Sequence, residues 1–313
     1  RDPSIEDVAR EAGVSGQTVS RVVNARGYVG EATRRRVNDA MSTLGYRPNS
    51  AARALRSGRF RTIGVIMFTL ASYGNNRTLN AIAARAARAG YTLTLLPVES
   101  ATRGTVTGAF HRLREHAVDG IIIIIETHDL DGDELEVPGG VPVVVVDSTQ
   151  REAHAFVDTD QAQGARAATE HLLELGHATV WHVAGPEGSY SAQRRRDAWS
   201  ETLESHGRTV PPVLHGDWSA RSGFNAAERL LEVGDATAVF TANDEMAIGL
   251  LRALRERGLD VPRDMSIVGF DDAPDAEYIW PPLTTVRQNF EAVGESAIDA
   301  LLAEIDGTDT GAP

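Results

Sequence analysis

Cysteine and lysine are both absent from the 313 residues. Without cysteine the chain forms no disulfide and no thiolate metal site, which fits a protein of a reducing compartment. Long apolar runs are also missing, since the longest, 120–125, is far shorter than the roughly 18 residues of a membrane span. Residues 1–14 are polar and lack the apolar segment of a signal peptide. These absences predict a cytoplasmic protein without a membrane partner.

Signatures of common enzyme chemistry are missing as well. The chain has no P-loop and no nucleotide-binding glycine fingerprint, and its histidines are not spaced as metal ligands. The carboxylates of Asp271 and Asp272 could suggest glycoside hydrolysis, but adjacent residues at the end of a strand diverge and do not flank one glycosidic bond. We therefore expect no enzyme activity, no cofactor and no metal.

Charge is distributed unevenly along the chain, whose net charge is −13. Residues 1–61 hold 12 arginines and 6 acidic residues, whereas residues 62–313 hold 19 arginines and 38 acidic residues. A basic segment attached to an acidic body is typical of a nucleic-acid-binding module on a larger domain.

Three short helices are predicted within the first 46 residues. Ser4 and Asp7 have the spacing of a capping box before a first helix. The segment 12–14 contains a glycine and forms a tight turn, after which Ser15 is a good N-cap for a second helix. A third helix is predicted from about 31 to 44. A helix, a short turn and a second helix are the plan of a helix-turn-helix module.

The second helix carries polar side chains suited to DNA. Gln17, Thr18, Arg21 and Asn24 are expected to point outward, where amide and guanidinium groups read base edges and hydroxyls hold phosphates. The apolar side chains of the module are expected to bury against one another: Val8, Ala9, Val14, Val19 and Val22. The spacing alone also fits a generic three-helix cap with a polar solvent face.

From residue 62 onward, short β-rich runs alternate with amphipathic helices. The predicted strands are 62–67, 92–97, 120–125, 141–147, 179–184, 238–242 and 266–270. The predicted helices are 77–90, 103–116, 161–175, 192–206, 220–233 and 244–257. Continuously apolar strands that alternate with helices predict parallel sheets covered on both faces, and the length favours two α/β subdomains.

Polar and aromatic residues at the carboxyl ends of these strands are candidates for a ligand site. Carboxylates accept hydrogen bonds from vicinal hydroxyls, arginine donates paired hydrogen bonds, and an indole covers the apolar face of a sugar ring. The candidates with this chemistry are Asp147, Arg195, Trp218, Asn243 and Asp271. Asp244 and Asp272 are ambiguous, since either could instead cap a helix or link two lobes.

Several segments resemble the lactose-repressor and galactose-repressor family of bacterial transcription regulators. In the amino-terminal part they are 5–15, 17–24 and 33–49, and in the core 216–220, 242–244, 269–272 and 282–288. The resemblance implies a helix-turn-helix headpiece (1–46), a hinge (47–59) and a two-lobed periplasmic-binding-protein-like core (60–313). The amino-terminal lobe would hold 60–157 and 289–313, and the carboxyl-terminal lobe 158–288.

The same resemblance assigns roles in DNA binding. Gln17 and Arg21 match positions that read bases. Phosphate-holding positions are matched by Ser4, Ser15, Thr18, Ser20, Asn24, Tyr28, Thr33 and Tyr46. Gly16 lacks the side chain of a base-contacting position, and Gly30 replaces a hydroxyl-bearing residue, which predicts the loss of one helix cap and one phosphate contact.

Residues 48–55 resemble the family's hinge helix, in which Asn49, Ala52 and Leu55 face DNA. Leu55 would insert between base pairs in the minor groove, at a cost in unstacking energy that a bent, better-wrapped operator offsets. The alternative is that Leu55 only packs within the linker. An isolated helix this short is marginal in water, so we expect it to form on DNA.

The resemblance also implies a homodimer on double-stranded operator DNA and a small saccharide as effector. The effector-contacting positions are matched by Asp147, Arg195, Trp218, Asn243, Asp271 and Phe290, with Gln288 close by. Arg195 is chosen because it lies four residues before Trp199, while Arg194 and Arg196 fit a solvated helix face. A free sugar-binding protein and a purine-responsive corepressor remain as alternatives. The sequence therefore predicts a repressor of sugar-utilisation genes that a saccharide releases from its operator.

Overall fold

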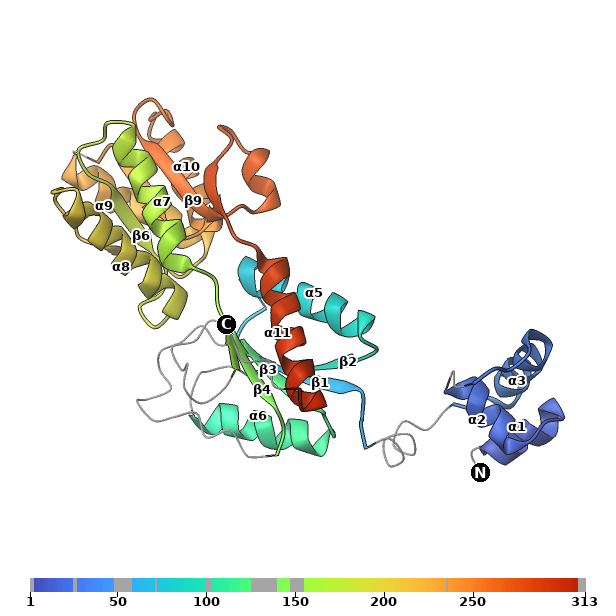
Figure 1. Cartoon of the computed structure of the whole chain (residues 1–313). Coiled ribbons are helices and arrows are strands. Elements are labelled where there is room, and N and C mark those ends of the chain that lie inside the picture. Colours follow the sequence, from blue (N-terminus) through green and yellow to red (C-terminus); the bar gives the residue numbers. More distant parts are fainter. Residues whose placement is uncertain are drawn as a thin grey trace. The chain divides into compact units, whose positions relative to one another are not determined.

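The computed structural model describes residues 3–24, 27–47, 58–70, 72–98, 103–124, 140–146, 155–234 and 236–308 (Figure 1). The chain separates into two compact units, Arg1–Phe60 and Arg61–Pro313. Among the described residues, no helix is both long enough and apolar enough to cross a membrane.

The first unit, the headpiece, contains α1 (Ile5–Ala12), α2 (Gly16–Val23) and α3 (Glu31–Leu44). The predicted capping box is confirmed, because Ser4 Oγ accepts from Asp7 N while the Asp7 carboxylate accepts from Ser4 N. Ser15 Oγ accepts from Thr18 N at 3.2 Å and begins α2 as predicted. Gly30 begins α3 without any side-chain cap, as the missing hydroxyl predicts.

The headpiece helices pack around a small aliphatic core. Four of the five residues predicted to be buried are buried, and Val14 is half-buried against them. Val37 and Ala40 of α3 complete this core. Buried aliphatic contacts therefore fix the angle between α1 and α2, leaving the polar side of α2 to solvent.

The second unit, the core, contains two parallel five-stranded sheets, which confirms the predicted α/β class. The order in the first sheet is β2-β1-β3-β4-β5, with β1 (Thr62–Met67), β2 (Thr92–Pro97), β3 (Gly120–Ile124), β4 (Val143–Val146) and β5 (Ala155–Val157). The order in the second is β10-β9-β8-β6-β7, with β6 (Trp181–Ala184), β7 (Leu214–His215), β8 (Ala238–Thr241), β9 (Ser266–Asp271) and β10 (Thr284–Arg287).

Helices cover both faces of each sheet and so define two lobes (Figure 1). The N-lobe adds α5 (Tyr73–Arg88), α6 (Arg103–Glu115) and α11 (Phe290–Asp306) to the first sheet. The C-lobe adds α7 (Gln161–Glu174), α8 (Tyr190–Ser205), α9 (Ala220–Val233), α10 (Asp244–Glu256) and the 3₁₀ turn η1 (Pro274–Glu277) to the second.

Strand β3 shows why its sequence is continuously apolar. Ile122 and Ile124 pack with residues of α5 and α11 on one face of the sheet. Ile121 and Ile123 pack with residues of α6 on the opposite face. Because successive side chains of a strand point to opposite faces, a strand covered on both sides needs apolar residues at every position.

Helix α11 returns to the N-lobe after the chain has built the whole C-lobe. It packs against α5, where Arg85 pairs with Asp299 and Arg88 pairs with Glu295. The chain thus passes from one lobe to the other between β5 and α7, and again between β10 and α11. The sequence patterns predicted neither α11 nor the strands β5, β7 and β10.

Candidate functional site

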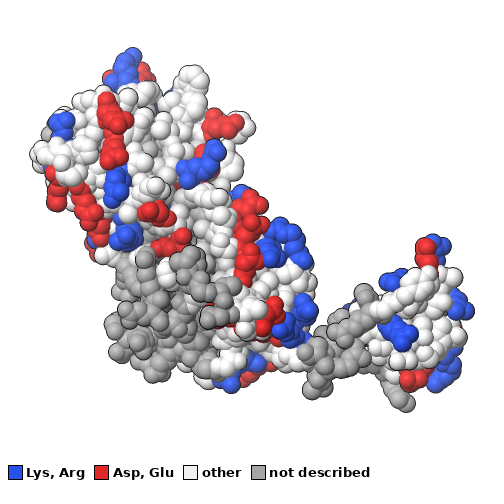
Figure 2. Space-filling view, in the orientation of Figure 1, with Lys and Arg blue, Asp and Glu red and all other residues white. Residues whose placement is uncertain are grey.

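The exposed side of α2 carries the two candidate base-reading residues. Gln17 and Arg21 are both exposed and lie four positions apart, so they share one face of the helix. Arginine side chains outnumber acidic ones on the face of the headpiece that Figure 2 shows. An amide and a guanidinium on one exposed helix face, within a basic unit, provide groups suited to a major groove.

The candidate phosphate-binding residues of the headpiece differ in how freely they extend. Tyr28 is 94% exposed. Asn24 is the C-cap of α2, and its side-chain amide donates to the Ser20 carbonyl oxygen at 2.6 Å. Thr18 Oγ1 lies 3.0 Å from Ser15 Oγ. The half-buried candidates are Ser4, Thr18, Ser20, Asn24, Thr33 and Tyr46.

Four candidates lie outside the described residues. They are Asn49, Ala52 and Leu55 of the hinge and Asp147 of the core. Their proposed contacts with DNA and with the effector stay predictions.

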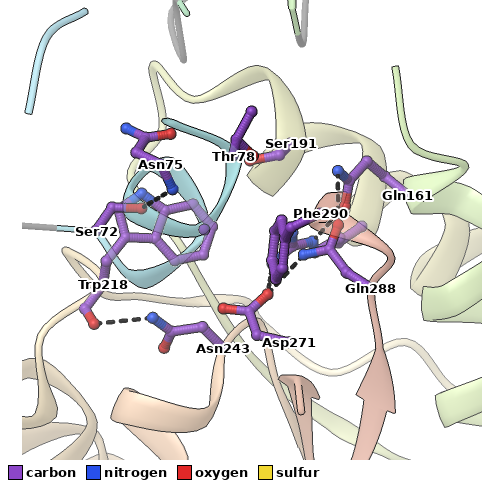
Figure 3. Close-up of a pocket in the computed structure, with 12 residues that line it drawn as sticks. Ser72, Asn75, Thr78, Gln161, Ser191, Trp218, Asn243, Asp271, Gln288 and Phe290 are labelled. Carbon is purple, nitrogen blue, oxygen red and sulfur yellow. Dashed lines mark hydrogen bonds and ion pairs between the residues drawn. The ribbon is translucent and has the colours of Figure 1, made fainter. Parts of the chain in front are cut away.

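The six described effector candidates line one cavity between the N-lobe and the C-lobe of the core (Figure 3). They are Arg195, Trp218, Asn243, Asp271, Gln288 and Phe290. Six further described residues line the cavity, and the sequence patterns did not predict them: Ser72, Gly74, Asn75, Thr78, Gln161 and Ser191. The structure thus brings together residues separated by more than 200 positions in the chain.

The indole of Trp218 lies against the backbone of Gly185. A Cβ atom at position 185 would be only 2.4 Å from Trp218 Cη2, so no side chain fits there. Trp218 has a left-handed φ of 70°, which is costly for a large side chain and is typical of functional sites. Its Nε1–H is buried and has no hydrogen-bond partner within the described part of the chain. The cavity therefore has an indole in its lining whose position the backbone of Gly185 restricts.

A closed set of contacts joins four polar side chains of the cavity. Arg195 Nε donates to Gln161 Oε1 at 2.8 Å, and Gln161 Nε2 donates to Gln288 Oε1 at 3.3 Å. Gln288 Nε2 donates to Asp271 Oδ1 at 2.6 Å, and Arg195 Nη1 lies 3.8 Å from the same oxygen. The guanidinium also stacks on Phe270, 3.9 Å from the ring centroid. Arg195 and Asp271 are therefore held in fixed positions before any ligand arrives.

Asp271 combines burial with an unusual backbone conformation. Its φ of 111° lies in the left-handed region, where a non-glycine residue is strained. Burial raises the pKa of its carboxyl to about 7, although the charge of Arg195 and the hydrogen bond from Gln288 act in the opposite direction. A carboxylate that is poorly solvated, with a cation beside it, can exchange hydrogen bonds with a ligand hydroxyl.

The two ambiguous aspartates have structural partners within the C-lobe. Asp244 is buried and accepts from Ala273 N at 2.7 Å and from Thr285 Oγ1, which ties α10 to β10 and to the loop after β9. Asp272 pairs with Arg287. These partners all belong to the C-lobe, and the residue that caps α10 is Asn243.

Asn243 and Phe290 each connect an element end to the cavity. Asn243 Oδ1 accepts from Met246 N at 2.9 Å, and its amide donates to the Trp218 carbonyl oxygen at 3.0 Å. Phe290, in the first turn of α11, lies edge-on to Tyr73 with ring centroids 5.8 Å apart. Asn243 therefore positions the Trp218 loop, and Phe290 provides a second aromatic ring at the cavity.

Comparison with known proteins identifies the family. Residues 4–49 match the model of bacterial regulatory proteins of the lacI family, and residues 169–313 match that of a periplasmic binding protein-like domain. The chain is 37% identical over 303 residues to the lactose operon repressor of Escherichia coli (strain K12), covering 96% of this chain and 84% of the relative. The chain belongs to the lacI family. It is a DNA-binding transcriptional regulator.

Other members of the lacI family are similar over nearly the whole length. A transcriptional repressor named PurR from Haemophilus influenzae (strain PittEE) is 32% identical over 312 residues, covering 98% of this chain and 93% of its own. The lac repressor dimer bound to operator and an anti-inducer superposes with a TM-score of 0.89 at 36% identity, covering 99% of this chain and 94% of that chain. The complex of the regulator CelR with cellobiose has a TM-score of 0.73 at 30% identity, with coverage of 99% and 95%.

Proposed function

We propose that this protein is a homodimeric, cytoplasmic repressor of sugar-utilisation genes that a small saccharide releases from operator DNA. The observation that carries the proposal is the cavity between the core lobes. There the indole of Trp218 and the ring of Phe290 accompany the polar pair Arg195 and Asp271. Aromatic faces beside fixed polar groups match the apolar ring face and the hydroxyls of a sugar.

We assign one function to each of the three predicted segments of the chain. Residues 1–46 bind DNA, with Gln17 and Arg21 reading bases and the hydroxyl-bearing residues holding phosphates. Residues 47–59 form the hinge, in which Leu55 is proposed to wedge between base pairs. Residues 60–313 bind the effector. A saccharide shifts the equilibrium only if it binds the DNA-released form of the protein more tightly than the DNA-bound form.

A purine effector, which the family resemblance leaves open, is the second candidate, and the chain is 32% identical to the repressor named PurR. The chemistry of the cavity favours a sugar, because the carboxyl of Asp271 and the amides of Gln161 and Gln288 suit hydroxyl groups. Two of the relatives described above also favour a sugar over a purine, since one is named for the lactose operon and another is in complex with cellobiose.

The test is operator binding titrated with both classes of ligand. Operator sequences are first selected from random duplex DNA with the full chain, and affinity is then measured at fixed salt with mono- and disaccharides and with purines. We expect one or more sugars to weaken operator binding, with a coupling of about 1–3 kcal/mol. Asp271→Ala should bind operator normally and lose the response, whereas Arg21→Ala should weaken operator binding by about 1–3 kcal/mol and keep effector binding.

A purine that changes operator affinity while no saccharide does would reject the sugar assignment. A sugar that tightens operator binding would keep the sensor but reject release as the direction of the response.

A further inference from the structure

The carboxylate of Glu6, in the first turn of α1, lies at the start of α2, where Gly16 has no side chain. From this placement we propose that Glu6 reads a base in the major groove and selects cytosine at one position of each operator half-site. The inference rests on the proposed function only in taking α2 as the helix that reads bases. It adds to Gln17 and Arg21 a base-reading residue from a different helix.

The contact between Glu6 and Gly16 is close. A Cβ atom at position 16 would be 2.6 Å from Glu6 Oε1, 3.3 Å from Cδ and 3.5 Å from Oε2. All three atoms of the carboxyl group therefore lie where a side chain of the first residue of α2 would begin, next to Gln17. Any residue larger than glycine at position 16 would displace this carboxylate.

The core of the headpiece fixes this arrangement. Val8 of α1 and Val19 of α2 are fully buried in the same aliphatic core, so the two helices hold one another in place. Gly16 begins α2 directly after the N-cap Ser15. The N-terminal end of a helix carries a partial positive charge, which favours a carboxylate beside it. Glu6 is therefore stabilised at the start of α2 before DNA binds.

The carboxylate of Glu6 is available to a further partner. Glu6 is exposed, and its side chain makes no hydrogen bond or ion pair with any residue that the structure describes. The neighbouring carboxylate of Asp7, in contrast, is engaged by Ser4 and Arg10. In helix-turn-helix modules the N-terminal residues of the second helix contact base edges in the major groove. The free carboxylate thus lies at the end of α2 that meets the bases.

The chemistry of a carboxylate restricts which base it can contact. An ionised carboxylate only accepts hydrogen bonds. In the major groove guanine presents two acceptors, thymine an acceptor and a methyl group, and adenine a donor beside an acceptor, whereas cytosine presents only its N4 amino donor. Because phosphates repel a carboxylate, its place near DNA is favourable only where it meets a donor. Cytosine is therefore the base that matches Glu6.

The test measures the base preference of the full chain at each operator position. The operator selected from random DNA and its symmetric single-base-pair variants are titrated at fixed salt by fluorescence anisotropy. We expect cytosine at one position of each half-site to be preferred about 5- to 10-fold per half-site. Glu6→Gln keeps the length of the side chain but introduces an amide, which suits adenine. It should reduce the preference for cytosine over adenine at that position to less than about twofold and leave the preferences at other positions unchanged.

Glu11→Gln is the matched control for the change in charge. Glu11 is also an exposed glutamate of α1, but it lies in the last turn of the helix. Its substitution changes the net charge by the same amount as Glu6→Gln. It should therefore change the affinity for all DNA sequences by one common factor and keep the preference for cytosine.

Gly16→Ala tests the placement of the carboxylate. The new Cβ overlaps Glu6 Oε1, so the carboxylate must move while the charge of the headpiece stays the same. Alanine is a better helix former than glycine, so the variant should be at least as stable to urea as wild type. It should lose the preference for cytosine as Glu6→Gln does.

Three results would count against these assignments. A Glu6→Gln variant that keeps the preference for cytosine, or that changes the affinity for all sequences equally as Glu11→Gln does, refutes base reading by Glu6 and leaves the proposed function intact. A Gly16→Ala variant that keeps the preference refutes the position beside Gly16 as its cause. A wild-type protein that selects no sequence from random duplex DNA refutes the proposed function itself.

Discussion

At the scale of single residues, the contact between Gly185 and Trp218 determines where the indole lies in the cavity. In a Gly185→Ala variant the new Cβ overlaps the ring, so Trp218 must move. We expect the affinity for the bound saccharide to fall at least about tenfold, because a stacking face works only when it is correctly placed. The measurement is a titration with that saccharide, with urea unfolding to follow stability.

The matched control is Gly108→Ala in α6. There a Cβ would have no atom within 4 Å, and Gly108 lies inside a helix, so the substitution should stabilise the fold by about 0.5–1 kcal/mol. Unchanged saccharide binding in Gly185→Ala would contradict the placement of Trp218 against the ligand.

The residue Asp271 should make effector binding depend on pH near neutrality. Burial raises its pKa to about 7, and the ionised carboxylate is the better acceptor for a sugar hydroxyl. Saccharide affinity should therefore increase from pH 6 to pH 8 and level off above that range. Asp271→Asn should remove this increase, which isothermal titrations of both proteins at matched ionic strength would show.

The raised pKa of Asp271 also determines how the stability of the folded protein changes with pH. The pKa of Asp271 in the folded state lies above its unfolded value of about 3.9, so the folded state binds more protons between these two values. The contribution of Asp271 to stability is therefore fully present below the pKa of the unfolded state, and it is lost as the pH rises through the folded-state pKa of about 7. Burial also raises the pKa of Asp244 to about 6, but Asp244 is present in both wild type and Asp271→Asn, so it does not account for the difference between them. The stability of wild type relative to Asp271→Asn should fall between pH 5 and pH 8, and a constant difference would contradict the assignment.

At the scale of elements, the sequence predicted the helices and strands whose position depends on neighbouring residues, such as N-caps and apolar runs. The capping serines located the starts of α1 and α2, and continuous apolar runs located β1, β3 and β9. β7 was missed because it has only two residues, and β10 because its residues are not fully buried. Helix α11 does carry an apolar spacing at Val293, Ala297 and Leu301, but the strand before it, β10, lacks a buried apolar pattern, so the alternation of strands and helices is not recognisable there.

In the candidate site, too, residues with a local sequence signal were predicted and residues without one were missed. Residues at the end of a strand or just after it, such as Asp271 and Asn243, were predicted because the carboxyl ends of parallel strands meet at one edge of a sheet. The polar wall of α5 was missed because Asn75 and Thr78 lie within a helix, where a buried polar residue has the same sequence pattern as an exposed one. Only the packing of the core reveals which helix face borders the cavity.

At the scale of the whole molecule, an exposed apolar patch on the C-lobe supports a homodimer. Trp280 is 81% exposed and Tyr278 80%, and Ile248, Leu251 and Ile279 lie around the same hollow as Trp280. Clusters of this kind on a soluble protein mark interaction surfaces more often than they remain in water. A dimer also provides the second headpiece, which a single short recognition helix needs for useful sequence specificity.

Replacing Trp280 should therefore affect both assembly and DNA binding. We expect Trp280→Glu to shift the protein from dimer to monomer in sedimentation experiments and to weaken operator binding at least about tenfold, because a charge is unfavourable at a buried interface and the two headpieces then bind independently. Val233→Glu is the control, since Val233 is also an exposed apolar residue of the C-lobe, 51% exposed, at the end of α9 and outside this hollow. It should leave both the dimer and operator binding unchanged.

The wild-type footprint should cover a roughly palindromic site with half-sites about one helical turn apart, or a multiple of it. A tight monomeric complex, or a footprint over a single half-site, would show that one headpiece suffices and that the patch around Trp280 serves another purpose.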